Sequence, residues 1–460
     1  MVSANQAPAS GAALDADDAT GAAAADAAAA DGAEGAAADG TAADARAAGP
    51  AQPGASLRRN WNFQALWTSE AFAGLAKEAA EVAYPLLILA TTGSAFYAGA
   101  VGAAQLFTAS FMAIPGGMLA DHVGRRFLLM TCDLIRAVLL GAFALLIVTH
   151  HTGLPAIFAI SIASAICLGI SNPTGLAVIK QLVRPDQIKQ ATAQNQIRFF
   201  GATMVGPPVG GSLFGLAQAL PFLAAGISFG VGAVLTQLIR TPMKVVTGAK
   251  GFSWSATMDG FRFLVRQPTL RLMMIWIIGS NAAFTHSSVF LAIVATAKSR
   301  GEPPSLIGAT LAVAGFGGIA GALVAGWVLK RVRPGWIFIG AAWAGPIAAV
   351  GLAIVPGAIP LGIIVACVFV RAPIVNALFL AYIAKMVPDE LQGRVLGAVM
   401  FMSMIATPIG VFFVGVIFSA AGPVWVFTAI GAVAALAALP MLSRRIRTLP
   451  QPEDIAEETA

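Results

Sequence analysis

The chain has 460 residues, of which 58% are hydrophobic, 11% are charged and 49 are glycine. Its mean hydropathy of +0.80 excludes an ordinary soluble globular domain and is typical of a protein that crosses a membrane many times. A net charge of +6 would favour nucleic acid in a soluble protein, but these basic residues are dispersed among loops. We therefore interpret them as topology signals and expect no nucleic-acid partner.

Residues 1–57 differ in composition from everything that follows. Ala, Asp and Gly dominate, aromatic residues are absent, and eight acids stand against the single base Arg46. Such a segment cannot bury enough apolar surface to offset the entropy lost on ordering. We predict a disordered cytoplasmic tail.

Apolar runs of about 20 residues, the length that crosses a bilayer, predict twelve transmembrane helices in two sets of six. The first set covers 65–91, 96–119, 128–149, 154–178, 191–215 and 219–239. The second set covers 272–297, 305–329, 335–356, 359–383, 395–420 and 423–443. The predicted fold is an all-α membrane protein with bundles at 58–240 and 271–445, a linker at 241–270 and a cytoplasmic tail at 446–460.

The distribution of Lys and Arg among the loops predicts the orientation. The side of the N-terminus carries twenty-one of these residues, including Arg125, Lys250 and Arg333, whereas the other side carries only Lys298 and Arg300. Because basic loops remain in the cytoplasm, we predict that both termini are cytoplasmic.

The two sets of spans resemble each other at an offset of 204 residues or one fewer. The matched pairs are Gly117 with Gly321, Arg126 with Lys330, Asn172 with Asn376, Gly206 with Gly410, and Gly211 with Gly415. Duplicated six-helix halves are typical of transporters in which two bundles rock about a site between them.

The linker between the halves contains the stretch FSWSATMDGFRFLVRQPTLR, from Phe252 to Arg271. Its mixture of aromatic, aliphatic and basic residues favours an amphipathic helix at the membrane interface. A solvated tether without any role beyond its length is the alternative.

Between the second and third spans, the segment GGMLADHVGRR contains Gly117, Asp121, Gly124, Arg125 and Arg126. This G-x-x-x-D-x-x-G-R-R pattern resembles the signature of the major facilitator superfamily, in which the glycine permits close helix packing and the charges form a conformational latch. His122 stands where that family usually has a basic residue, and Ala325 replaces the acid in the second half. The resemblance therefore implies a latch in the first half only.

The fifth span contains GPPVGG, with Gly206, Pro207, Gly210 and Gly211. It resembles the core of an element associated with exporters of the same superfamily. Prolines kink a helix and glycines permit close contact, so a packing element without any directional role is the alternative. The stretches PDELQGRVLG and DLIRAVLL further resemble the branch of drug and siderophore exporters that includes macrolide and enterobactin exporters.

The first span carries Glu70, Lys77, Glu78 and Glu81 on one side of a helix. An ionisable side chain at membrane depth costs on the order of 3 kcal/mol, and an exposed i, i+4 ion pair returns only about 0.3–0.5 kcal/mol. This face therefore has to line a wet cavity, and at least one carboxylate needs a remote cation, water or a proton. Arg371 in the tenth span is the candidate cation.

In the family that the chain resembles, spans one, four, seven and ten line a central cavity. The resemblance implies that cavity candidates are Arg371, Asn172, Asn376, Asn281, Thr285 and His286. We predict Glu81 first and Glu78 second as proton carriers, with Lys77 beside them and Glu70 merely hydrated. A fixed pair between Lys77 and Glu81, and His286 as a simple hydrogen-bonding residue, are the alternatives.

The leading hypothesis is a proton-coupled exporter of the bacterial inner membrane that moves a drug-like compound or a siderophore by alternating access. Its partners would be the small molecule, protons and membrane lipids, and one chain with two halves needs no second copy. An importer is the nearest alternative, followed by a non-transporting sensor or scaffold. Cys132, Cys167 and Cys367 lack metal or disulfide spacing, and nucleophile and phosphate-loop motifs are absent, so we predict no enzyme, cofactor or metal.

Overall fold

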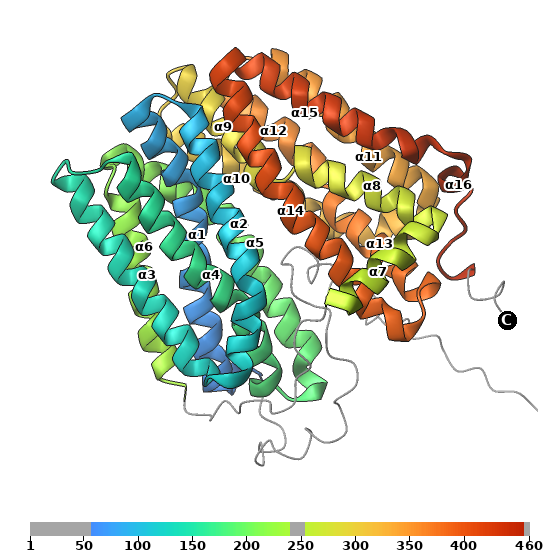
Figure 1. The fold of residues 1–460 in the computed structure, drawn as a ribbon, viewed down its shortest axis with the longest axis horizontal. Helices are drawn as coiled ribbons and strands as arrows, with labels where there is room; N and C mark the ends of the chain where they lie inside the picture. Colours follow the sequence, from blue (N-terminus) through green and yellow to red (C-terminus); the bar gives the residue numbers. More distant parts are fainter. Residues whose placement is uncertain (1–56, 240–253, 455–460) are drawn as a thin grey trace, which may run out of the picture.

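The computed structural model describes residues 57–239 and 254–454, which are almost entirely helical. The first six helices pack together in one bundle (Figure 1). They are α1 (Trp61–Thr92), α2 (Ala95–His122), α3 (Arg125–Val148), α4 (Leu154–Leu182), α5 (Ile188–Leu216) and α6 (Leu220–Gln237). The predicted tail 1–57 lies outside the described residues except for Leu57, which is fully buried and begins a 3-10 turn.

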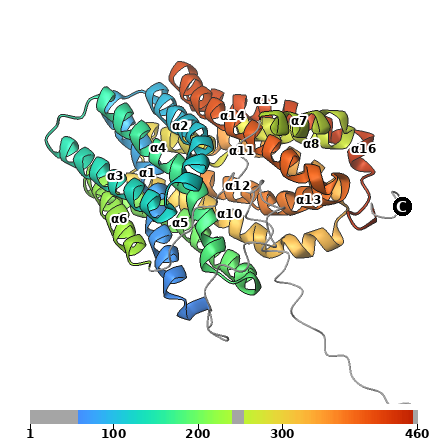
Figure 2. The same ribbon diagram turned by 60° about the horizontal axis from the view of Figure 1, so that its bottom comes forward.

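The second bundle lies beside the first in both ribbon views (Figures 1 and 2). It contains α8 (Pro268–Ala283), α9 (His286–Ser299), α10 (Pro304–Arg331), α11 (Pro334–Ile354), α12 (Ala358–Phe369), α13 (Arg371–Met386), α14 (Asp389–Ala421) and α15 (Pro423–Ala438). A 3-10 turn (Leu439–Leu442) and the short α16 (Arg444–Arg447) follow. The predicted spans at 272–297 and 359–383 are present, and each of them is made of two helices.

The two interruptions have different local causes. Pro373 has no N–H to donate to the carbonyl of Phe369, and its ring crowds that carbonyl, so α12 ends there and α13 begins at Arg371. Between α8 and α9, Thr285 adopts an extended backbone, and its hydroxyl accepts a hydrogen bond of 3.3 Å from the Ser288 N–H. Thr285 is thus an N-cap that starts a new helix.

Ten helical segments of the described residues are long and apolar enough to cross a membrane, with α8 joined to α9 and α12 joined to α13. Helices α1 and α5, with 32 and 29 residues, are long enough but more polar. Both pack inside the first bundle, against each other and against α6. With these two, the bundles contain the twelve spans that the sequence predicts.

The helix predicted in the linker is α7 (Trp254–Arg266), which packs against α14 (Figure 2). The Arg394 side chain of α14 lies 3.3 Å from the Asp259 carboxylate, and Gly260 is in backbone contact with the Arg394 carbonyl. The described part of the linker is therefore attached to the second bundle, which disfavours the alternative of a solvated tether for these residues.

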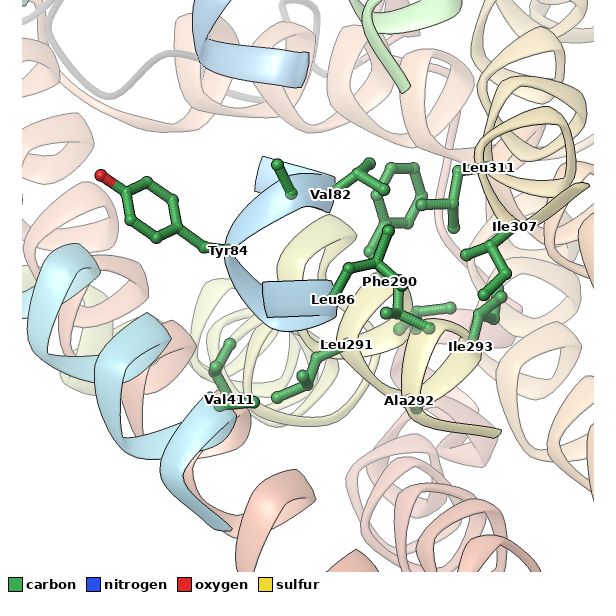
Figure 3. Packing of buried hydrophobic residues seen from close by; sticks show 14 of the residues in the cluster. Val82, Tyr84, Leu86, Phe290, Leu291, Ala292, Ile293, Ile307, Leu311 and Val411 are labelled. Atoms are coloured by element: carbon green, nitrogen blue, oxygen red, sulfur yellow. The ribbon is translucent and has the colours of Figure 1, made fainter. Parts of the chain in front are cut away.

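One apolar cluster joins the two bundles (Figure 3). Val82 and Leu86 of α1 lie beside Phe290 of α9, with Ile307 and Leu311 of α10 next to them. All five side chains are at least 97% buried, so apolar packing holds the halves together at this level of the molecule.

Glycine contacts extend this junction toward the end of the molecule that carries the α1–α2 and α14–α15 turns. A Cβ on Gly99 of α2 would lie 2.8 Å from the Gly415 Cα of α14, and one on Gly211 of α5 would lie 3.0 Å from the Gly308 Cα of α10. Such distances require bare backbone on both sides. We call this the sealed end, and the opposite end, with most Lys and Arg, the basic end.

Candidate functional site

A cavity of about 1380 Å³ lies between the bundles and borders the apolar cluster, since Phe290 and Val411 of that cluster line it. All six residues predicted for a substrate cavity line it, namely Arg371, Asn172, Asn376, Asn281, Thr285 and His286. The four charged residues of α1, Glu70, Lys77, Glu78 and Glu81, line it as well. Toward the basic end the cavity reaches Asn195 and Gln196 in the first turns of α5.

The two α1 carboxylates predicted to carry protons meet the first residues of α9 across the boundary between the bundles. The Oε2 atom of Glu78 lies 3.5 Å from Nε2 of His286, and the Ser287 hydroxyl donates a hydrogen bond of 2.8 Å to Oε1 of Glu81. The Lys77 ammonium lies 3.8 Å from Oε1 of Glu78, its immediate neighbour. We call Glu78, Glu81 and His286 the acidic cluster.

The interruption of the seventh span explains why this cluster forms. Because α9 starts at His286, its N-terminal turn lies at the depth of the cavity rather than at a membrane surface. The start of a helix presents unbonded N–H groups and the positive end of the helix dipole, which favours nearby carboxylates. The discontinuous span therefore gives Glu78 and Glu81 a favourable neighbour from the other half.

The GPPVGG segment of α5 packs directly behind Glu78. A Cβ on Gly206 would overlap the Glu78 Cβ, and one on Gly210 would overlap the Ala79 backbone. Gly211, one residue on, faces α10 instead. One short segment of α5 thus fixes the position of the carboxylate helix and also contributes to the sealed end.

Two atoms of the acidic cluster face each other without a hydrogen bond. Oε2 of Glu78 and Nε2 of His286 are both buried, and neither has a hydrogen-bond partner among the described residues. Glu78 is only 4% exposed. A proton on Nε2 of His286 would turn the 3.5 Å contact into a charge-assisted hydrogen bond to Glu78. A proton on Oε2 of Glu78 would instead neutralise a buried negative charge.

The acidic cluster is also the group of described residues that comes closest to a metal-ligand set, since its donor atoms lie within 4.8 Å of one another. Two carboxylates and an imidazole suit a divalent transition metal. However, the Lys77 ammonium lies 3.8 Å from Glu78 and would repel a doubly charged ion. The arrangement fits a proton better than a metal.

Glu70 has a partner that sequence reasoning missed. Nη1 of Arg198 on α5 lies 3.5 Å from the Glu70 carboxylate and donates a 2.9 Å hydrogen bond to the Glu70 carbonyl. The expectation that Glu70 is merely hydrated was therefore wrong. A signal existed, because Arg198 is the only Lys or Arg within the predicted span 191–215.

Arg371 does not supply the cation that the α1 carboxylates need. Its guanidinium donates to the Ala341 carbonyl at 3.0 Å and to the Ser280 hydroxyl at 3.3 Å. No carboxylate in the described part of the chain forms an ion pair with it. The expected pairing of Arg371 with α1 is therefore wrong for this conformation.

Two further polar residues of the cavity wall, Asn281 and Arg136, have partners within the protein. Asn281 donates a hydrogen bond of 2.7 Å to the Ser403 hydroxyl, which joins α8 to α14. Arg136 of α3, which is not among the predicted site residues, is 5% exposed, and its guanidinium carbon lies 3.7 Å from the centre of the Phe229 ring. It is thus covered by an aromatic face.

The predicted latch lies at the basic end, far along α2 from the glycines of the sealed end. Arg126 donates to the Gln237 carbonyl of α6, and Arg125 is buried. Asp121 lies in the last turn of α2, but its side chain is outside the described part of the structure.

The glycine that permits close packing near the latch differs from the one that the resemblance implies. A Cβ on Gly117 would meet nothing within 4 Å, whereas one on Gly116 would lie 2.7 Å from the Ile170 Cα of α4. Gly124 is the N-cap of α3 and is also uncrowded. In this conformation Gly116 makes the close contact, so the implication for Gly117 was wrong.

Comparison with known proteins gives one family match. A sequence model described as Major Facilitator Superfamily matches residues 66–410. No curated protein sequence matches the chain significantly.

Solved structures share the fold at low sequence identity. The nucleoside transporter NupG aligns with a TM-score of 0.65 and 13% identity, covering 85% of this chain and 100% of that chain. A bacterial homologue of the human lysosomal transporter Spinster, in an inward-facing and unoccupied conformation, aligns with a TM-score of 0.63 and 16% identity. The alignment covers 88% of this chain and 96% of that chain. A bacterial homologue of the iron transporter ferroportin, in an inward-facing state, aligns with a TM-score of 0.61 and 16% identity. The alignment covers 85% of this chain and 100% of that chain. These similarities concern the fold alone.

Proposed function

Because the chain belongs to the Major Facilitator Superfamily, we propose that it exports an amphipathic small molecule, such as a drug-like compound or a siderophore, in exchange for protons. The predicted all-α membrane fold is confirmed, and the family identifies a membrane transporter rather than an enzyme. Proton coupling, direction and substrate belong to the proposal.

The observation that carries the proposal is the contact of the acidic cluster across the two bundles. Glu78 and Glu81 belong to the first half, and His286 and Ser287 belong to the second. A proton on either carboxylate removes a negative charge from the start of α9 and weakens the attraction between the halves. Proton binding and bundle movement are therefore linked by the same atoms.

The closed and open ends of the molecule support the proposed direction of transport. The sealed end is closed by helix contacts, and the cavity extends toward the basic end. With the basic end in the cytoplasm, this conformation takes a substrate from inside the cell, as an exporter requires. The resemblance of GPPVGG to exporters supports this direction, and an importer releasing its cargo inward is the alternative.

The cycle that we propose uses one binding site in two conformations. The substrate enters the cavity from the cytoplasm while the carboxylates are ionised, and the bundles then rock so that the sealed end opens. Protons from outside neutralise Glu81 or Glu78 as the substrate leaves, and the protonated carrier returns. Release of the protons inside restores the attraction between Glu78 and His286.

The test uses purified protein in liposomes that contain a pH-sensitive dye. Ethidium, a cation, and N-dansylglycine, an anion, serve as probes of transport. We expect at least one of them to accelerate dissipation of an imposed pH gradient, and Glu78→Gln and Glu81→Gln to reduce that acceleration at least about tenfold, because the amide cannot take up a proton.

Glu302→Gln, in the loop between α9 and α10, is the matched control and should behave as wild type. If both cavity variants retain probe-driven proton movement, the acidic cluster does not couple protons. Comparing uptake in right-side-out and inverted vesicles then separates export from import.

A further inference from the structure

Arg371 is a cation of the described cavity wall that forms no ion pair with a carboxylate. Among the other wall cations, Arg198 pairs with Glu70, Lys77 lies beside Glu78, and Arg136 is covered by Phe229. Arg371 is half-buried and bonds only to a carbonyl and a hydroxyl. Its guanidinium therefore offers a negative group a cation that no carboxylate of the described wall neutralises.

The structure holds this guanidinium in a defined position. Two hydrogen bonds, to Ala341 on α11 and Ser280 on α8, occupy two of its five N–H groups and leave three for another acceptor. Arg371 is also the first residue of α13, the helix that starts where Pro373 interrupts the tenth span. Val370 is at the same time the C-cap of α12, so the helix dipoles largely offset each other at this point, and the guanidinium itself supplies the attraction for a negative group.

The surroundings of Arg371 suit an apolar body attached to that negative group. The guanidinium carbon lies 5.9 Å from the centre of the Trp276 ring. Trp276, Phe369 and Phe379 line the same cavity. A ligand could thus place a planar oxyanion on the guanidinium, with two parallel hydrogen bonds, and rest its hydrophobic part on these rings.

We propose that Arg371 binds the carboxylate of the transported molecule, so that the substrates are amphipathic organic acids. This inference rests on the proposed transport function and names its substrate class. The anion occupies Arg371 on the second half, whereas protons occupy the acidic cluster between the halves. Export of an anion in exchange for protons moves negative charge outward, which an inside-negative membrane potential favours.

The test measures binding without any pH gradient, so that it is independent of coupling. N-Dansylglycine and its primary amide differ only in the negative charge, and energy transfer from Trp residues to the dansyl group reports binding to purified protein in nanodiscs. We expect wild type to bind the acid at least about tenfold more tightly than the amide, and Arg371→Gln to bind both equally. Arg371→Lys should retain part of the preference for the acid over the amide. Lysine keeps the positive charge but cannot donate two parallel hydrogen bonds to one carboxylate. Trp276→Phe should reduce the energy-transfer signal strongly, because a nearby donor is lost, while the affinity of the protein for N-dansylglycine should change less.

Arg300→Gln, an exposed arginine in the loop after α9, should keep the full preference of wild type. The inference is overturned if wild type binds neither compound, if it binds both equally, or if the preference survives Arg371→Gln. It is also overturned if Arg198→Gln alone abolishes the preference, which would place the anion site on α5. A failure of proton coupling in liposomes with intact acid binding would instead overturn the proposed exchange mechanism and leave this inference standing.

Discussion

The position of Glu78 depends on contacts from both sides. Gly206 leaves room for it behind α1, and His286 faces it from the other bundle. Glu78, Glu81 and His286 could be predicted from the sequence, because ionisable residues are rare in membrane spans. Ser287 and the role of Arg198 were not predicted, because a serine beside Thr285 and His286 is not distinguished by residue type and a partner more than 100 residues away requires the fold. Arg371 was also favoured as the partner of α1, since charge alone does not specify geometry.

The residue scale gives a prediction for Gly206. Its substitution by Ala places a methyl group against Glu78, and overpacking of this kind costs about 1–3 kcal/mol. We expect Gly206→Ala to lower the apparent melting temperature of the purified protein in detergent. Gly201→Ala on the same helix is the control, because a Cβ there meets nothing within 4 Å and Ala favours the helix. Equal melting temperatures for the two variants would contradict a tight α1–α5 contact at Glu78.

At the scale of elements, the number and order of the helices could be predicted from hydropathy, but the two interrupted spans could not be predicted from it. The mean hydropathy over 18 residues is high in each joined span, at 1.5 in Pro268–Ser299 and 2.3 in Ala358–Met386, although polar residues such as Asn281, His286 and Arg371 lie close to the interruptions. Pro373 was a visible signal for the second interruption, although membrane helices often tolerate proline. The break before His286 depends on a threonine cap, a feature that hydropathy does not detect. Both interruptions lie at the cavity, so the missed features are those that build the candidate site.

The glycine contact between α2 and α14 leads to a prediction for the sealed end. A Cβ on Gly415 would lie 2.6 Å from the Ala95 carbonyl, so Gly415→Leu forces the two helices apart. We expect this variant to favour the conformation in which the sealed end is open. Spin labels at Ser94→Cys and Ala421→Cys, in a cysteine-free background, should report a longer distance between the two turns.

Gly326→Leu on α10 serves as the control, because a Cβ at Gly326 meets nothing within 4 Å. Its spin-label distances should match those of the parent. A folded Gly415→Leu protein with the parent's distances would show that the glycine contact does not determine which end is open.

At the scale of the whole molecule, the internal repeat explains why two helix pairs form the seal. Gly211 and Gly415 are related by the 204-residue offset, and each packs against the opposite half. The repeat is incomplete at the predicted latch, where Ala325 of the second half is buried and cannot carry charge. The sequence could predict this asymmetry, but the attachment of α7 to the second bundle required the structure.

The distribution of basic loops gives a prediction for the orientation of the molecule. We expect a membrane-impermeant maleimide to label Glu302→Cys in intact cells, because this loop lies on the side with only two basic residues. Arg445→Cys, on the opposite side, should react only after the membrane is permeabilised. The reverse labelling pattern would place both termini outside and would reverse the proposed direction of transport.

The glycine contacts at the sealed end also determine how the closed state responds to ionic strength and to pH. Gly99, Gly415, Gly211 and Gly308 meet through backbone atoms, without an ionisable side chain or an ion pair. Such van der Waals contacts are not weakened by ionic strength and do not titrate. External salt and acidity therefore act on the closed state only after ions or protons have reached the charged residues deeper in the cavity.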